Sequence, residues 1–121
     1  MSTLPSRDVC VLRYVLDRWA EEKPDQVFSI FEDDETWTYR ETWERTRRLG
    51  AAFQAMGVEE GEHVVVWLPN GKECLEAYFA LGYIGAVFVP VNVAYRGDLL
   101  AHVIDNSDAR LAIVHRDLAD R

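Results

Sequence analysis

The hydrophobic pattern between residues 63 and 92 predicts a strand, a helix and a second strand. Residues 64–68 are an unbroken apolar run, which is typical of a strand covered on both faces by helices. A turn at Pro69-Asn70-Gly71 follows, and residues 75–83 then carry apolar side chains at spacings of three and four, as one helix face lying on a sheet would. Residues 87–89 are the next buried strand. Such close spacing favours a right-handed parallel βαβ unit.

A second crossover follows the first. Residues 96–106 carry apolar side chains at helical spacing, namely Leu99, Leu100, Val103 and Ile104. Residues 111–114 form a third short apolar run, expected to be buried, and residues 117–121 begin another element. We therefore predict three parallel strands in one sheet with the two helices packed on it. The fold class is α/β with a Rossmann-like parallel βαβαβ unit.

The chain before residue 63 predicts a helix, a hairpin and a second helix. Residues 9–22 are amphipathic, with Arg13, Asp17 and Arg18 away from the apolar side, and Lys23-Pro24 ends that helix. Residues 27–31 and 36–39 have the composition of strands and flank an acidic turn, so they predict an antiparallel hairpin.

The second helix of this part begins at a capping box, Thr38-x-x-Glu41, and runs to Met56. Acid-first pairs four residues apart, Glu41/Arg45 and Glu44/Arg48, predict salt bridges on its exposed face. We prefer this interpretation of the arginine cluster at residues 45–48 to an anion site. The expected inward residues are Trp43, Thr46, Leu49, Ala52, Phe53 and Met56.

Composition narrows the classes of function. The chain has 121 residues, 49% of them hydrophobic, and a net charge of −8, which argues against a nucleic-acid partner. No apolar run approaches the roughly 20 residues that span a bilayer, and the N-terminus lacks a secretory signal pattern. We therefore expect a cytoplasmic protein. Cys10 and Cys74 are far apart and are interpreted as reduced packing thiols.

Motifs for metal and phosphate binding fail on their spacing. The acidic turn at residues 32–35 lacks the alternating ligands and glycine of a calcium loop, so we interpret it as a solvated hairpin tip. Gly71-Lys72 resembles the end of a phosphate loop, but Val66 stands where glycine is needed and Glu73 where a magnesium-binding hydroxyl is needed. Lys72 can at best attract an anion weakly.

The remaining motifs give no catalytic candidate either. Gly82 and Gly85 form part of a dinucleotide fingerprint but lie at a helix end, where packing and capping explain them. The histidines, His63, His102 and His115, have no ligand spacing. No serine, cysteine or threonine lies in a nucleophile elbow. The sequence thus assigns no catalytic, cofactor-binding or metal residue.

The order of several weak motifs carries a resemblance that covers most of the chain. These motifs are Thr38-Tyr39-Arg40-Glu41, residues 48–52, Met56-Gly57-Val58 with Gly61, residues 64–70, residues 85–92, and residues 100–104 with 106–110. Together they resemble the N-terminal portion of the AMP-forming adenylate synthetases, which include acyl-CoA synthetases, luciferase-type enzymes and peptide-synthetase adenylation domains. The departures, at Thr42-Trp43 and Gly61-Glu62-His63, concern packing and a loop.

The resemblance implies that a carboxylic acid attacks the α-phosphate of ATP and that CoA then takes the acyl group, with Mg²⁺ required. The family's Ser/Thr/Gly-rich phosphate loop ending in Pro-Lys comes later in its chains and is absent here, so no site residue is carried over and no bound cofactor is expected. Residues 1–121 are then a single partial domain, an incomplete part of a larger one, inactive by itself. The acyl acid is expected to be fatty or otherwise medium to long.

Two further expectations follow from these interpretations. A partial domain exposes apolar surface that its remainder would cover, so the isolated chain should self-associate, most readily if any of its four tryptophans is uncovered. The alternative function is a stand-alone, non-catalytic α/β module that binds a partner or a nucleotide at the carboxyl ends of its strands. Coding DNA that continues into a Pro-Lys phosphate loop would favour the ligase.

Overall fold

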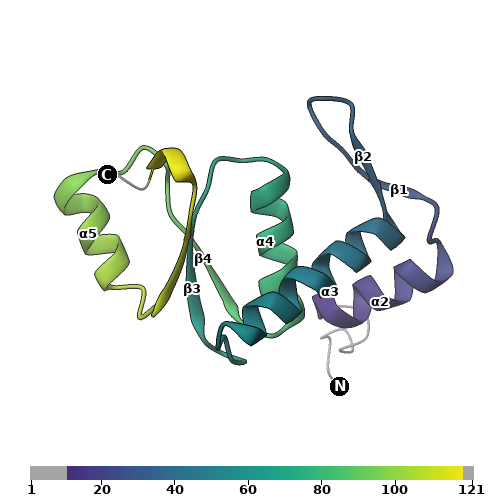
Figure 1. Ribbon diagram of the computed structural model, residues 1–121, viewed down its shortest axis with the longest axis horizontal. Helices are drawn as coiled ribbons and strands as arrows, with labels where there is room; N and C mark the ends of the chain where they lie inside the picture. Colours follow the sequence, from purple (N-terminus) through teal and green to yellow (C-terminus); the bar gives the residue numbers. More distant parts are fainter. Residues whose placement is uncertain (1–10, 119–121) are drawn as a thin grey trace, which may run out of the picture.

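A three-stranded parallel sheet lies between helices in the computed structural model, which describes residues 11–118. Helix α4 (Lys72–Tyr83) covers one face of the sheet and helix α5 (Gly97–Asp105) covers the other (Figure 1). Helix α3 (Tyr39–Ala55) packs along α4 and reaches the same face of the sheet at its C-terminal end, and α2 (Leu12–Glu22) packs on α3 and α4 farther out. The hairpin of β1 (Val27–Ile30) and β2 (Thr36–Thr38) projects beyond them.

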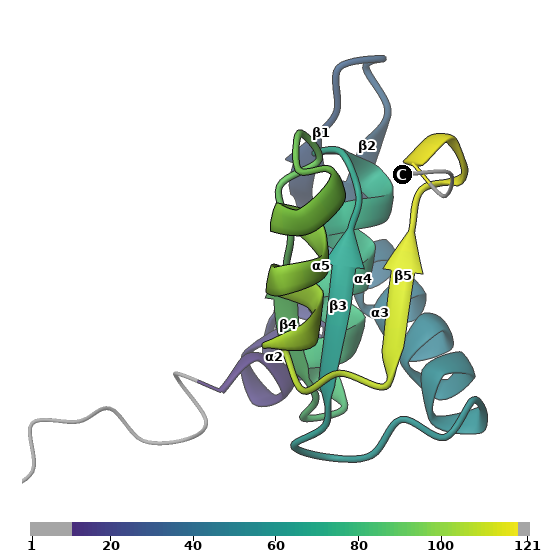
Figure 2. The same ribbon diagram turned by 90° about the vertical axis from the view of Figure 1, so that its left-hand side faces the viewer.

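The sheet confirms the predicted topology. Its strands are β3 (His63–Trp67), β4 (Val87–Pro90) and β5 (Leu111–Val114), in the order β4-β3-β5. β3 pairs in parallel with both neighbours. Seen from the side of α5, β3 and β5 run in one direction and α4 lies behind the sheet (Figure 2). The first crossover steps from β3 to β4 and the second returns past β3 to β5, so right-handed connections put the two helices on opposite faces.

Burial corrects the expectation that all three strands are buried. Residues Val64 to Trp67 of β3 are at most 4% exposed, whereas Val87 of β4 is 41% exposed and Val114 of β5 is 38% exposed. The reason is position, because β4 and β5 are the edge strands of this three-stranded sheet and each has a neighbouring strand on one side only. The continuous apolar runs predicted all three strands correctly. They predicted full burial correctly only for β3.

Helix α4 is buried on more of its circumference than one sheet-facing stripe. Ala77, Phe79, Ala80 and Leu81 are its buried residues, while Tyr78, expected to face the sheet, is 49% exposed. The cause is α3, since α4 packs against both the sheet and α3. At their crossing Gly50 of α3 approaches α4 so closely that an added Cβ would lie 3.0 Å from Cγ2 of Ile84.

The N-terminal part confirms the antiparallel hairpin and the capping box. The Glu41 amide donates to Thr38 Oγ1 and the Thr38 amide donates to the Glu41 carboxylate, both over 3.1 Å. Tyr39 therefore belongs to α3 rather than to the strand in which it was expected, because the cap starts the helix there. The expected helix start at Val9 and the thiol of Cys10 lie outside the described residues.

The exposed faces of two helices differ from expectation. Glu41 is committed to the cap, and the ion pairs of α3 are instead Arg40–Glu44 at 3.2 Å and Arg45–Glu76 at 4.0 Å. Two arginines of α3 also lie over tryptophan rings, Arg45 over Trp37 and Arg47 over Trp43. Three apolar residues expected inward are exposed, namely Ala52 and Met56 of the α3 region and Leu99 of α5.

Candidate functional site

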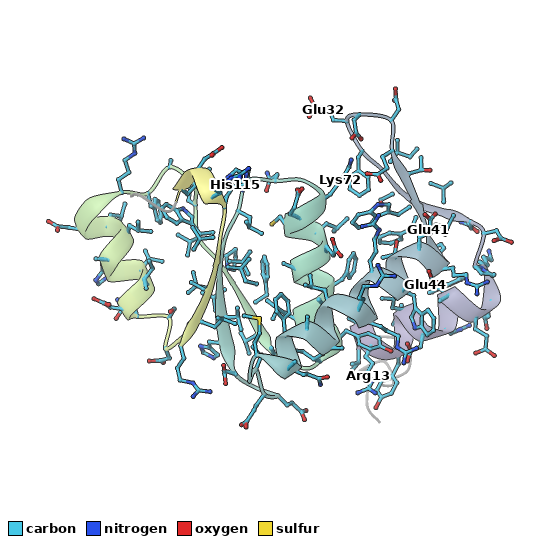
Figure 3. The ribbon with its side chains drawn as sticks, viewed as in Figure 1. Arg13, Glu32, Glu41, Glu44, Lys72 and His115 are labelled. Atoms are coloured by element: carbon cyan, nitrogen blue, oxygen red, sulfur yellow. The ribbon has the colours of Figure 1, made fainter. Side chains whose placement is uncertain are left out.

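The carboxyl ends of the three strands meet at one edge of the sheet. There the main chain just beyond β5 and β4 stays joined to β3, since the His115 amide donates to the Trp67 carbonyl over 3.2 Å and the Val91 amide to the Val66 carbonyl over 3.0 Å. Trp67 Nε1 donates to the Asn92 carbonyl over 3.1 Å and fixes the loop after β4. Lys72 and His115 both lie at this end of the sheet (Figure 3). Open parallel sheets bind ligands at such an edge.

Two neighbouring cavities open beside this edge. One, of about 350 Å³, lies between the loops that follow β3 and β4, and its wall includes Asn70, Cys74 and Asn92. The other, of about 420 Å³, shares Asn70 and Cys74 and is otherwise mainly apolar and aromatic, with walls from Phe31, Leu75, Tyr78 and Phe88. Burial raises the pKa of the Cys74 thiol, which favours the protonated thiol over the nucleophilic thiolate. The prediction of a packing thiol agrees with this environment.

Lys72, at the start of α4, is neutralised by the acidic turn of the hairpin. Its ammonium group contacts the Asp33 carboxylate at 2.5 Å and also pairs with Glu35. The hydrogen bond from Lys72 lowers the pKa of Asp33, and the hydrogen bonds to Asp33 and then Glu35 raise the pKa of Lys72. The acidic turn is therefore not the purely solvated tip we expected, because it docks on α4. With two carboxylates already bound, Lys72 does not fit a triphosphate.

Asp17 of α2 joins three helices. The expectation that its side chain faces outward is therefore wrong. Its Oδ1 accepts a hydrogen bond from Trp43 Nε1 over 2.7 Å and another from the Tyr83 hydroxyl over 2.6 Å. Burial, and next the bond to Asp17, raises the pKa of Tyr83. Half-buried tryptophan and tyrosine need partners for their polar ends, and that need was the signal in the sequence for this contact.

The three histidines make hydrogen bonds within the fold. His63 Nδ1 lies 2.7 Å from the Ser107 carbonyl, so this nitrogen carries the proton and ties β3 to the turn after α5. His115 Nδ1 accepts from the amide of Asp117 over 3.1 Å. Within residues 11–118 no three histidine, cysteine, aspartate or glutamate side chains gather as a metal site. In the same range, no helix has the length and apolar character to cross a membrane.

Comparisons with known proteins identify relatives over most of the chain. A family model described as AMP-binding enzyme matches residues 16–121. Acetyl-coenzyme A synthetase of Halorhodospira halophila is 36% identical over 103 residues, which is 81% of this chain and 16% of that protein. Crotonobetaine/carnitine–CoA ligase of Salmonella paratyphi A is 31% identical over 106 residues, which is 84% of this chain and 20% of that protein.

Solved structures show the same arrangement of elements. The structure of VinN in complex with L-aspartate superposes with a TM-score of 0.82 at 29% identity, covering 91% of this chain and 31% of that one. The N-terminal subdomain of NpsA from Klebsiella oxytoca, in complex with anthranilyl-AMSN, gives a TM-score of 0.76 at 31% identity and covers 83% and 26%. The chain thus spans at most about a third of these structures and a fifth of the two curated relatives.

Proposed function

The chain belongs to the family of AMP-binding, adenylate-forming enzymes, and on this basis we propose that its protein is an AMP-forming carboxylic acid–CoA ligase. One observation carries the proposal: the family match extends over residues 16–121, and two relatives of 31–36% identity that align over more than four-fifths of the chain are CoA ligases by name. The match supports, from residue 16 onward, the resemblance that the short ordered motifs carry.

In the proposed reaction the carboxylate of the acid displaces pyrophosphate from ATP and forms an acyl-adenylate. The CoA thiolate then attacks the acyl carbon, and AMP leaves. Mg²⁺ screens the phosphate charges in such displacements. Lys72 is already paired with carboxylates, and residues 11–118 hold no group of three possible metal ligands, so we assign none of these residues a step.

The contribution of this chain is structural. It supplies the parallel sheet whose carboxyl edge, with Asn70 and Asn92, forms one wall of a site that other parts of a longer protein would complete. By itself the chain is inactive, because adenylation needs donors and a metal aimed at the α-phosphate and such preorganised electrostatics is usually the largest catalytic effect. We place the enzyme in the cytoplasm and expect a medium to long acyl acid as substrate.

Acid-dependent exchange of radioactive pyrophosphate into ATP tests the adenylation step. Residues 1–121 are expected to give no exchange above buffer with a panel of fatty and aromatic acids. The protein encoded by the complete reading frame is expected to give exchange with at least one acid. Exchange by residues 1–121 that is lost in Lys72→Met but kept in Lys23→Met would contradict both the proposed inactivity and our account of Lys72.

The acceptor thiol is tested separately with the complete protein. CoA-dependent release of AMP would support the ligase, whereas adenylate formation without release to CoA would favour transfer to a carrier domain. The second outcome has precedent among the relatives, since a linear gramicidin synthase of Brevibacillus parabrevis is 29% identical over 115 residues. A reading frame that stops at Arg121 would instead favour the stand-alone binding module. Self-association of the isolated chain stays a prediction, to be checked by light scattering.

A further inference from the structure

The loop between β3 and α4 contains an Asn-Gly pair, Asn70-Gly71, and it is the only such pair in the chain. An asparagine can lose its side-chain amide when the backbone nitrogen of the next residue attacks the side-chain carbonyl carbon. Glycine obstructs this attack least, because it has no Cβ and its backbone is the most permissive. The other two asparagines precede residues with side chains, Val93 after Asn92 and Ser107 after Asn106.

The fold leaves the reacting groups of this pair free. Asn70 and Gly71 are both exposed. Among residues 11–118, neither the Asn70 side chain nor the Gly71 amide takes part in a hydrogen bond; only the Gly71 carbonyl is engaged, by the Leu75 amide over 3.0 Å. Gly71 has φ of 154°, a value that side chains seldom accept, so glycine is required here and the reactive pair is kept by the conformation.

Hydrogen bonds restrain the other two asparagines, Asn92 and Asn106. The Asn92 side-chain oxygen accepts from the Ala94 amide over 2.8 Å, and the next residue is β-branched. At Asn106 the nucleophile itself is occupied, because the Ser107 amide donates to the Ile104 carbonyl over 3.1 Å. Ser107 is also buried, at 7% exposure, and the Asn106 amide contacts the His102 ring. Folding should therefore slow the reaction at Asn106 and leave Asn70 open.

We infer that Asn70 is a site of spontaneous covalent modification, deamidation to aspartate and isoaspartate. The Gly71 nitrogen forms a bond to Asn70 Cγ and ammonia leaves, which gives a cyclic succinimide. Water then opens either carbonyl of the ring: one opening gives aspartate, and the other gives isoaspartate, in which the main chain runs through the side-chain carbon. No oxidant or reductant is involved, and the net exchange is ammonia for water.

The product changes the edge of the sheet that carries the candidate site. Asn70 lies in the walls of both cavities, so a neutral amide there becomes a carboxylate. That charge arises two residues from Lys72, where it competes with Asp33 and Glu35 for the ammonium group. The start of a helix favours a negative charge, which stabilises the aspartate product. Isoaspartate also adds one carbon to the main chain that connects β3 to α4.

The experiment is ageing of residues 1–121 in mildly alkaline buffer, in folded form and in urea, followed by peptide mapping with mass spectrometry. Deamidation adds about 1 Da and one negative charge, and an isoaspartate-specific methyltransferase labels the second product. In the folded chain Asn70 is expected to convert at least about tenfold faster than Asn106, and urea is expected to accelerate Asn106 far more than Asn70. Heavy-oxygen water should label the product at Asn70.

Two matched variants make the result decisive. Asn70→Gln changes an exposed side chain without a hydrogen-bond partner among residues 11–118, so it should fold normally and lose the modification, whereas Asn106→Gln should leave the rate at Asn70 unchanged. The inference is overturned if folding slows Asn70 by about tenfold or more relative to urea, or if Asn70 and Asn106 react equally fast in the folded chain. Activity of the longer protein is not the readout, so this test is independent of the proposed ligase function.

Discussion

The two faces of the central sheet are covered to different depths. On one face Val64 and Val66 of β3 pack against α4, Phe53 of α3 joins the same core, and α2 packs on α3 and α4 farther out. On the other face Val65 and Trp67 pack against α5, of which only Leu100 is buried. Residues of the same strand are thus equally buried, although more helices cover one side of the strand than the other. This difference indicates that the α4 face is the stable core, while the α5 face rests on a single helix with few anchors.

Deleting one buried leucine on each face tests this difference and should give the largest effects. Leu81 of α4 is 0% exposed, so Leu81→Ala is expected to lower the free energy of unfolding by about 3–4 kcal/mol, since its cavity is closed on all sides. Leu100 of α5 is 5% exposed and lies under one layer, which can relax, so Leu100→Ala should cost about 2 kcal/mol.

Urea unfolding followed by circular dichroism measures both values. The control is Leu99→Ala, one position from Leu100 but 53% exposed, which should change the free energy by less than about 0.5 kcal/mol. Equal losses for Leu81→Ala and Leu100→Ala would show that the two faces are equally supported.

The polar contact that joins the helices behind the α4 face should have an intermediate effect. Asp17→Ala leaves Trp43 Nε1 and the Tyr83 hydroxyl without their acceptor in a half-buried place, which should cost about 2 kcal/mol. Asp17→Asn keeps an acceptor oxygen of the same shape, so it should cost less than about 1 kcal/mol. A larger loss in Asp17→Asn than in Asp17→Ala would contradict the role of the oxygen.

The titration of the Tyr83 hydroxyl tests the hydrogen bond between Tyr83 and Asp17 in a second way. Its folded pKa is raised above the unfolded value of about 10, so its contribution to stability is complete below that value and is lost as pH rises through the folded pKa. Absorbance of the phenolate should show a late transition in the wild type that moves to lower pH in Asp17→Asn. The shift should be partial, because burial is the larger cause.

The ion pairs that tie the hairpin tip to α4 should have the smallest effect on stability, because they are exposed and screened by salt. Asp33 contributes above its ordinary pKa of 3.8 and loses its contribution as pH falls through the lowered folded pKa. Lys72 contributes below its ordinary pKa of 10.5 and loses its contribution as pH rises through the raised one. Both groups therefore contribute fully to stability between pH 3.8 and pH 10.5.

Carboxyl NMR titration of Asp33 checks this account. In Lys72→Met the pKa of Asp33 should return toward its ordinary value, and amide exchange at residues 32–35 should become faster. Lys23→Met is the matched control, since Lys23 is the other lysine of the chain and lies over the Trp19 ring. An unchanged Asp33 titration in Lys72→Met would mean that the hairpin tip is solvated, as the sequence had suggested.

The order and type of the elements were readable from the amino-acid sequence alone. The apolar run at Val64 to Trp67 marks a strand buried on both faces, and the capping box at Thr38 and Glu41 marks the start of α3. These features are readable because they depend on residues close together in the chain, through backbone geometry, turn chemistry and side-chain period. The parallel direction of the three strands followed from the two helical crossovers between them.

The depth of each element and the meeting of polar groups emerge only in the folded chain. Asp17 lies 26 positions from Trp43 and 66 from Tyr83 in the sequence. Lys72 lies 39 positions from Asp33 in the hairpin tip. No local period encodes them. The exposed edges at Val87 and Val114 likewise depend on how many strands and helices surround them, which is a property of the assembled layers and not of an apolar run.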